Sequence, residues 1–162
     1  MSADQLARLY DDHAPALFRF LMALTGHEAD TRDLLQELFL RAARRPAEEV
    51  WRDPAAWLFR AARNLHTDFT RRRGTRERAL SRLAQQPVLP ADEETPPLCT
   101  ATALASLPDD QRAVVHLKIW ERLTFARIAE VLDIPAHTAA SRYRYALEKL
   151  RASLLQPHHA HE

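Results

Sequence analysis

The sequence predicts an all-helical protein made of two small domains. Only two of its 162 residues are glycine, whereas alanine, leucine, arginine and glutamate are frequent, which favours helices over a turn-rich β fold. Apolar residues recur at helical spacing in two separate blocks, and a segment rich in proline and acidic residues interrupts the pattern between them. We therefore expect a first domain at residues 1–82, a linker at 83–99, a second domain at 100–155 and a disordered tail at 156–162.

Two helices open the first domain. The first is predicted from Asp4 to Thr25, because leucines and aromatic residues recur there at helical spacing and Gly26 supplies a stop signal. Pro15 should bend or interrupt this helix, because proline has no backbone N–H to donate. The second helix is predicted at about residues 29–44, where a broad apolar stripe ends before Pro46.

A third helix is predicted after a connector at residues 46–53. Asp53 can accept hydrogen bonds as its N-cap, and Pro54 suits the first helical position. Its inward-facing apolar residues continue to Phe69, before the basic run at residues 71–73. Together the three helices carry enough leucine and aromatic side chains to form one small core.

The second domain is expected to end in a helix-turn-helix. Shorter helices are predicted at 102–107 and 108–121. Thr124 can cap a short helix that ends at a break over residues 133–136, and a longer helix then runs from about His137 to Leu155. If the apolar stripe of this longer helix faces the core, the opposite face carries Thr138, Ser141, Arg142 and Tyr145. By itself this pattern fits DNA binding or a plain helical hairpin.

Charge is distributed unevenly along a chain whose net charge is only +1. Eight arginines and two acidic residues lie between positions 60 and 82, whereas residues 83–110 contain five acidic residues and no basic one. This order suits a polyanion-binding face beside a solvated tether, and a solvated helix end is the alternative. The 21 arginines against 2 lysines favour bidentate phosphate contacts, although a biased base composition of the gene would look the same.

Other classes of protein are less well supported. No apolar run is long enough to cross a bilayer, and the first residues lack the order of a signal peptide, so we expect no membrane insertion and a cytoplasmic location. Cys99 has no second cysteine to pair with. An enzyme is the least favoured class, because no glycine-rich phosphate loop or metal-ligand motif is present, and no cofactor or metal site is expected.

Several motifs lie in a fixed order along the chain. The first domain contains DLLQELFLR at 33–41, AWLFRAARN at 56–64, Asp68, and the arginines at 71–73. The second contains LPDDQR at 107–112, IAEVL at 128–132, Ser141-Arg142, Ala146 and Leu150-Arg151. Taken together, these segments resemble the bacterial extracytoplasmic-function (ECF) sigma factors, the smallest sigma factors of RNA polymerase. The resemblance covers nearly the whole chain apart from the linker and the tail.

The resemblance implies a protein that binds core RNA polymerase and promoter DNA and promotes strand opening, and whose activity is held in check by an anti-sigma protein. The implied polymerase contacts are Asp33, Leu34, Gln36, Glu37, Leu40 and Arg41. The implied contacts to the promoter's minus-ten element are Trp51, Arg60, Arg63, Asn64, Asp68, Arg71 and Arg72. The implied contacts to the minus-thirty-five element are Thr138, Ser141, Arg142, Arg144 and Tyr145.

Two other interpretations stay open. A free-standing helix-turn-helix regulator would bind DNA without polymerase, but it would have no need of the segment from Asp33 to Arg41. A sigma-like interaction protein would bind sigma partners without initiating transcription. Ala140 and Tyr145 favour this second alternative, because they occupy positions that are often basic in the family, and Asp133 replaces the usual glycine of the turn.

Overall fold

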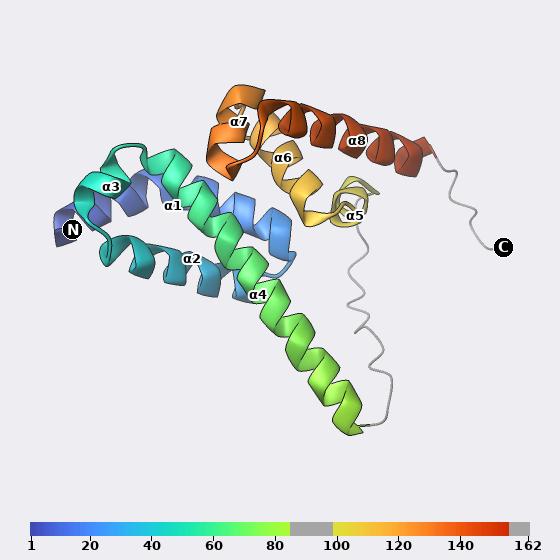
Figure 1. Ribbon diagram of the computed structural model, residues 1–162, viewed down its shortest axis with the longest axis horizontal. Helices are drawn as coiled ribbons and strands as arrows, with labels where there is room; N and C mark the ends of the chain where they lie inside the picture. Colours follow the sequence, from blue (N-terminus) through green and yellow to red (C-terminus); the bar gives the residue numbers. More distant parts are fainter. Residues whose placement is uncertain (85–98, 156–162) are drawn as a thin grey trace.

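The structure, a computed structural model, describes residues 1–84 and 99–155 and is entirely helical in those ranges (Figure 1). The N-terminal domain consists of α1 (Ala3–Thr25), α2 (Glu28–Ala43), α3 (Ala47–Trp51) and α4 (Pro54–Ala84). The C-terminal domain consists of α5 (Cys99–Ala105), α6 (Asp109–Ile119), α7 (Phe125–Leu132) and α8 (Ala136–Leu155). The all-helical prediction is confirmed. Most of the predicted linker and the whole predicted tail lie outside the described residues.

Three details of the N-terminal domain differ from the expectations. Pro15 lies within α1 without interrupting it, because it and Asp11, whose carbonyl it leaves without a helical donor, are both exposed to solvent. The connector after Pro46 contains the short helix α3, anchored by the buried Val50. Helix α4 continues well past Phe69, and its second half extends beyond the other helices (Figure 1).

The helix-turn-helix is present as predicted. The Thr124 side chain caps α7 by accepting a hydrogen bond from the backbone N–H of Arg127, at 3.2 Å. Asp133 ends α7 in the left-handed conformation, with φ +55° and ψ +52°, which aspartate tolerates better than most residues. Helix α8 then begins at Ala136, and Ala139 and Ala146 are buried against the rest of the domain.

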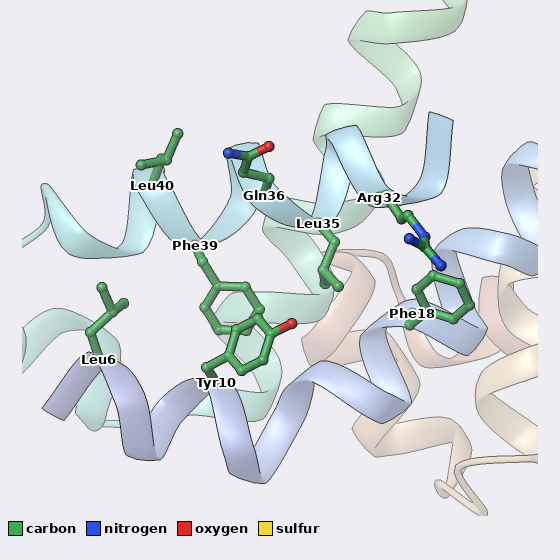
Figure 2. A pocket seen from close by; sticks show the side chains of 8 residues that line it. All are labelled: Leu6, Tyr10, Phe18, Arg32, Leu35, Gln36, Phe39 and Leu40. Atoms are coloured by element: carbon green, nitrogen blue, oxygen red, sulfur yellow. The ribbon is translucent and has the colours of Figure 1, made fainter. Parts of the chain in front are cut away.

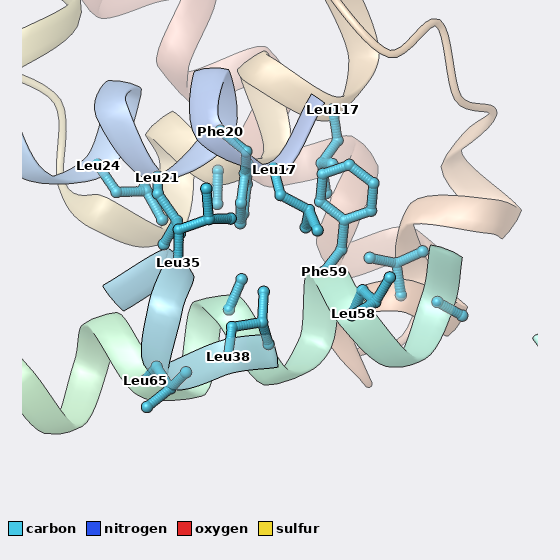
Figure 3. Packing of buried hydrophobic residues seen from close by; sticks show 14 of the residues in the cluster. Leu17, Phe20, Leu21, Leu24, Leu35, Leu38, Leu58, Phe59, Leu65 and Leu117 are labelled. Carbon is cyan, nitrogen blue, oxygen red and sulfur yellow. The ribbon is translucent and has the colours of Figure 1, made fainter. Parts of the chain in front are cut away.

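The two domains share one hydrophobic core. Leu17 and Phe20 of α1 and Phe59 of α4 belong to the same buried cluster as Leu117 of α6 and Ile128 of α7. Figure 3 shows Leu117 beside Phe59 and Leu17, at the point where the N-terminal helices meet α6. Helix α4 packs against α7, and α1 packs against α6. The sequence predicted a separate small core for the first domain, but the structure extends that core into the second.

Candidate polymerase and nucleic-acid interfaces

Helix α2 presents the predicted polymerase-binding residues on its outer side. Asp33, Gln36 and Leu40 are exposed. Glu37 accepts a hydrogen bond from Nε of Arg41 at 2.9 Å, and this bond holds the pKa of the Glu37 carboxyl below its ordinary value. The face therefore combines fixed charges with one exposed leucine, a composition suited to a protein partner.

Leu34 is the member of this predicted set that lies elsewhere. It is buried in the core, with 6% of its surface exposed, because the helical period places it on the side of α2 opposite the charged residues. It supports α2 from within and offers no outer contact surface. The motif identified the helix correctly, but a motif alone does not show which of its residues face inward.

A pocket adjoins the outer side of α2, between α2 and α1 (Figure 2). Tyr10 and Phe39 face one another within it, with ring centroids 4.8 Å apart. Gln36 and Leu40 lie at its edge and point away from α1. The sequence analysis assigned Tyr10 to the helical stripe of the core, yet it is half-exposed, so an aromatic ring joins this outer surface.

Helix α4 divides the predicted minus-ten residues into two groups. Asn64, Arg71 and Arg72 are exposed, and the half-buried Asp68 accepts a hydrogen bond from Arg71 at 3.3 Å. These four residues lie along one exposed, mainly basic part of the helix. Such a row of guanidinium groups can follow a nucleic-acid backbone.

Arg60 and Arg63, the second group, are turned toward the C-terminal domain. Nη2 and Nε of Arg60 donate to the backbone carbonyls of Glu130 and Val131 in α7. Arg63 donates to Asp110 Oδ1 at 2.7 Å. Both guanidinium groups therefore already have partners that a phosphate would have to displace.

Trp51, the remaining predicted minus-ten residue, lies at the end of α3. It is partly buried and packs against the shared core. Its indole Nε1 is enclosed and has no hydrogen-bond partner among the described residues. The ring can therefore contact a base only through the part of its surface that remains open.

The predicted recognition face of α8 is only partly open. Arg144 and Tyr145 are exposed, and the Arg144 guanidinium lies over the Tyr145 ring, 5.0 Å from its centroid. Ser141 donates to the backbone carbonyl of Thr138 at 3.1 Å, and both residues are half-buried. Arg142 is also half-buried, and its Nη2 lies 3.5 Å from Asp110 Oδ2.

Asp110, at the start of α6, therefore connects the two predicted DNA-binding surfaces. Its Oδ1 binds Arg63 of α4, and its Oδ2 approaches Arg142 of α8. The neighbouring Asp109 lies 3.0 Å from Nε2 of the buried His66, also on α4. The sequence analysis noted this acidic stretch only as a contrast to the basic one, and that contrast was the available signal for a pairing between them.

A second cross-domain contact is formed by Asp53 and Arg127, neither of which was singled out as a site residue. The carboxylate of Asp53 accepts two hydrogen bonds from the Arg127 guanidinium, each at 2.6 Å. This interaction lowers the pKa of Asp53 and raises that of Arg127. No sequence motif marks the pair, because 74 residues separate its members along the chain.

Two negative findings apply to residues 1–84 and 99–155. No cluster of three or more histidine, cysteine, aspartate or glutamate side chains is arranged to hold a metal ion there. None of the helices in these ranges is long and apolar enough to span a membrane.

Sequence comparisons match both domains to known families. Residues 9–76 match the family described as Sigma-70 region 2, and residues 103–152 match Sigma-70, region 4. The chain is 38% identical to the ECF RNA polymerase sigma factor SigL of Mycobacterium tuberculosis, over 90% of this chain and 86% of the relative. It is 28% identical to the ECF RNA polymerase sigma factor SigW of Bacillus subtilis, over 93% of this chain and 89% of the relative.

The fold is also found among solved structures. The chain superposes with a TM-score of 0.63 on a complex described as the sigma factor RpoE with the anti-sigma factor NepR from Bartonella quintana. The match covers 86% of this chain and 90% of that one, at 24% sequence identity. At this level of identity the similarity shows a shared fold.

Proposed function

The chain belongs to the ECF sigma factors of RNA polymerase, and we propose that its two domains bind core polymerase together and recognise the minus-ten and minus-thirty-five elements of promoters. The observation that supports this most is that both sigma regions occur in one chain in the expected order. A free-standing helix-turn-helix regulator would not need the N-terminal match. Since core polymerase acts in the bacterial cytoplasm, the proposal also places the protein there.

The outer side of α2 is the proposed polymerase contact. Its exposed Gln36 and Leu40 adjoin the pocket between α1 and α2, so polar and apolar groups lie next to one another. The Glu37–Arg41 ion pair fixes two further charged groups on the same helix. A partner helix could place an apolar side chain in the pocket while its polar groups pair with the rim.

The exposed part of α4 is proposed to bind the minus-ten element as the strands separate. Bases that leave the stack need polar groups to read their edges, while arginines hold the backbone phosphates. Asn64 and Asp68 offer the first kind of group, and Arg71 and Arg72 the second. Trp51 is close enough to the start of α4 to contribute part of an aromatic surface.

The recognition helix α8 is proposed to enter the major groove of the minus-thirty-five element. Thr138, Ser141 and Arg142 lie toward its start, which is the part of a recognition helix that reaches base edges in helix-turn-helix proteins. Arginine binds guanine through two hydrogen bonds, and hydroxyl groups bind either bases or phosphates. Arg144 and Tyr145 are the more exposed residues and suit contacts to the backbone.

We further propose that an anti-sigma protein controls the chain. The structural relative described above was solved with an anti-sigma factor. The surfaces assigned here to polymerase and DNA are the surfaces that such a partner would need to cover. Purification of the native protein from its source without a bound partner, and in an inactive state, would argue against this part of the proposal.

Run-off transcription with core polymerase tests the proposed function directly. We expect transcripts from promoters upstream of the chain's own gene only when the protein is added to core enzyme. Core binding without transcripts would favour the sigma-like interaction protein, and duplex DNA binding without core binding would favour a free-standing regulator.

A single substitution tests the polymerase surface. Leu40→Asp changes an exposed side chain, so the fold should persist while affinity for core polymerase falls at least about tenfold in a pull-down titration. Leu80→Asp is the matched control, because Leu80 is similarly exposed but lies near the end of α4. Equal affinities of the two variants for core polymerase would contradict the assignment.

A further inference from the structure

We propose that the described arrangement is a closed, self-inhibited form of the protein, in which the C-terminal domain occupies promoter-binding arginines of the N-terminal domain. The inference rests on the proposed function for the assignment of Arg60 and Arg63 to DNA. Its structural part, the existence of a closed form that specific contacts hold together, is independent of that assignment. No other protein is required to maintain this state.

The contact between the domains is extensive enough to be stable. Apolar side chains of α1 and α4 share one buried cluster with those of α6 and α7. The ring of Phe20 in α1 lies against His116 in α6, with centroids 5.5 Å apart and an edge-to-face orientation. Separation of the domains would expose these side chains to water, which is unfavourable.

Polar contacts at the boundary give the closed form a specific register. The two 2.6 Å hydrogen bonds between Asp53 and Arg127 join the start of α4 to α7. Arg112 of α6 donates to the carbonyls of Ala23 and Leu24, which lie in the last turn of α1 and have no helical donor. These contacts need both domains, since neither domain contains the donors and the acceptors together.

The same boundary covers groups that DNA needs. Arg60 donates to two carbonyls of α7, and Arg63 is paired with Asp110. Asp110 also approaches Arg142 on the proposed recognition helix. A phosphate that binds these guanidinium groups must displace their partners, and each carboxylate adds electrostatic repulsion against the incoming backbone. Arg71 and Arg72 remain exposed, so the proposed inhibition is partial and affects the first part of α4.

The spacing of promoter elements makes opening necessary. The two elements lie about 25 base pairs apart, which corresponds to about 85 Å of duplex at about 3.4 Å per base pair. A compact chain of 162 residues has a radius of gyration of only about 15 Å. Domains that remain in contact therefore cannot reach both elements, whereas residues 85–98 supply fourteen residues that can span up to about 50 Å.

Small-angle X-ray scattering on the full chain tests whether the closed form exists in solution. We expect the wild-type radius of gyration to match the compact arrangement. In Arg127→Ala the ratio of open to closed molecules should rise about tenfold, which is equivalent to about 1.4 kcal/mol, and the mean radius should increase. An extended wild-type chain, or the same radius in both proteins, would overturn the proposal.

Binding of a fluorescent, random-sequence single-stranded 20-mer supplies the second readout. Arg127→Ala removes a positive charge and should by electrostatics alone weaken DNA binding. If it opens the protein, it should instead bind the oligonucleotide several-fold more tightly. Arg8→Ala is the matched control, because it removes the same charge from an exposed position of α1. Equal or weaker binding by Arg127→Ala than by Arg8→Ala would contradict the masking of DNA contacts.

A second variant protects the test against a folding defect. Asp53→Asn loses the charge that pairs with Arg127 but keeps an oxygen that can accept the hydrogen bond from the Ala56 N–H at the start of α4. It should open the protein as Arg127→Ala does, whereas Asp12→Asn, at an exposed site, should not. None of these measurements uses polymerase or a promoter, so failure of transcription and failure of the closed form are distinguishable.

Discussion

Arginine side chains make many of the specific contacts that hold this molecule together. Arg112 is the most extensively bonded, because its guanidinium donates to five backbone carbonyls on two sides of α6. These carbonyls belong to Ala23, Leu24, Leu104, Ala105 and Leu107. The planar guanidinium has five N–H groups in a fixed fork, so it can satisfy several helix-end carbonyls that lysine could not reach together. Burial lowers the pKa of the Arg112 guanidinium, while the nearby Asp109 raises it.

Arg112→Ala should therefore destabilise the protein more than removal of an average surface arginine. Several buried carbonyls would lose their donor at once, and we expect a decrease of about 2–4 kcal/mol in the free energy of unfolding. Urea denaturation followed by circular dichroism measures it. Arg112→Lys should be intermediate, and the exposed Arg8→Ala should change stability by less than about 0.5 kcal/mol. Similar losses in Arg112→Ala and Arg8→Ala would show that the bonds are unimportant.

His116 gives stability a dependence on pH. Burial, aided by the positive charge of Arg19, lowers the pKa of His116 to about 4 from an ordinary value of 6.5. The carboxylate of Glu121, 3.5 Å from Nε2, favours the charged imidazole but does not outweigh burial. Between these two pH values the unfolded chain binds a proton that the folded protein does not. Stability from this residue is therefore complete above pH 6.5 and is lost as the pH falls toward 4.

The His116→Gln variant tests this dependence. Its free energy of unfolding should decrease less than that of the wild type between pH 7 and pH 4.5, and the two slopes should differ by up to about 3 kcal/mol over the whole window. Measurements at pH 7.5 supply the packing cost of the substitution, because His116 is neutral there in both the folded and the unfolded state. Parallel curves across the range would exclude His116 as the source.

At the scale of helices, the ends are determined by short-range chemistry. Ser2 and Gln5 form a reciprocal capping box at the start of α1, with hydrogen bonds of 2.9 and 3.2 Å. Gly26 ends the same helix at φ +71°, a conformation that glycine adopts without the steric cost of a Cβ atom. These signals act within a few residues, which is why the sequence predicted most helix ends closely.

The two glycines of the chain should respond to alanine in opposite directions. In Gly26→Ala the added Cβ meets no atom within 4 Å, so the expected loss of about 1 kcal/mol comes from the left-handed backbone alone. Gly74 lies inside α4 with open space around it, and Gly74→Ala should stabilise that helix by about 0.5–1 kcal/mol. Urea denaturation and helical circular dichroism measure both effects. Changes of the same sign would contradict this account of the two positions.

At the scale of the whole molecule, the shared core couples the two domains. Leu117 and Ile128 of the C-terminal domain are buried together with residues of α1 and α4. A domain that loses its partner exposes part of that surface, so neither domain should be as stable by itself as it is in the intact protein. Two otherwise ordinary helical domains therefore become one cooperative unit.

We expect the described domains to unfold in one transition. Trp57 reports on the N-terminal domain and Trp120 on the C-terminal domain. Fluorescence of two single-tryptophan variants, one that retains Trp57 and one that retains Trp120, should give the same midpoint in urea. Arg127→Ala should separate the two midpoints, because it weakens the coupling between the domains. Two distinct midpoints in both single-tryptophan proteins before that change would contradict a shared core.

Much of the fold and part of the site were predictable from the sequence, because they depend on local patterns. The apolar period predicted the helices, Thr124 and Asp133 marked the helix-turn-helix, and the motif at 33–41 identified the outer helix α2. The continuation of α4 to Ala84 was missed, because the exposed helix after Phe69 carries no apolar stripe. Its i,i+4 ion pair between Arg73 and Glu77 is the weak signal that favours this extension.

The sequence by itself determined where the helices lie and which family the chain resembles, since propensity, capping and periodicity act over a few residues. Only the tertiary structure decided that Leu34 faces inward, that Arg63 meets Asp110 and that Asp53 meets Arg127. These outcomes depend on which helix faces pack together, and the paired residues are 47 and 74 positions apart. No local pattern specifies such a pairing, because it results from burying two apolar surfaces against one another.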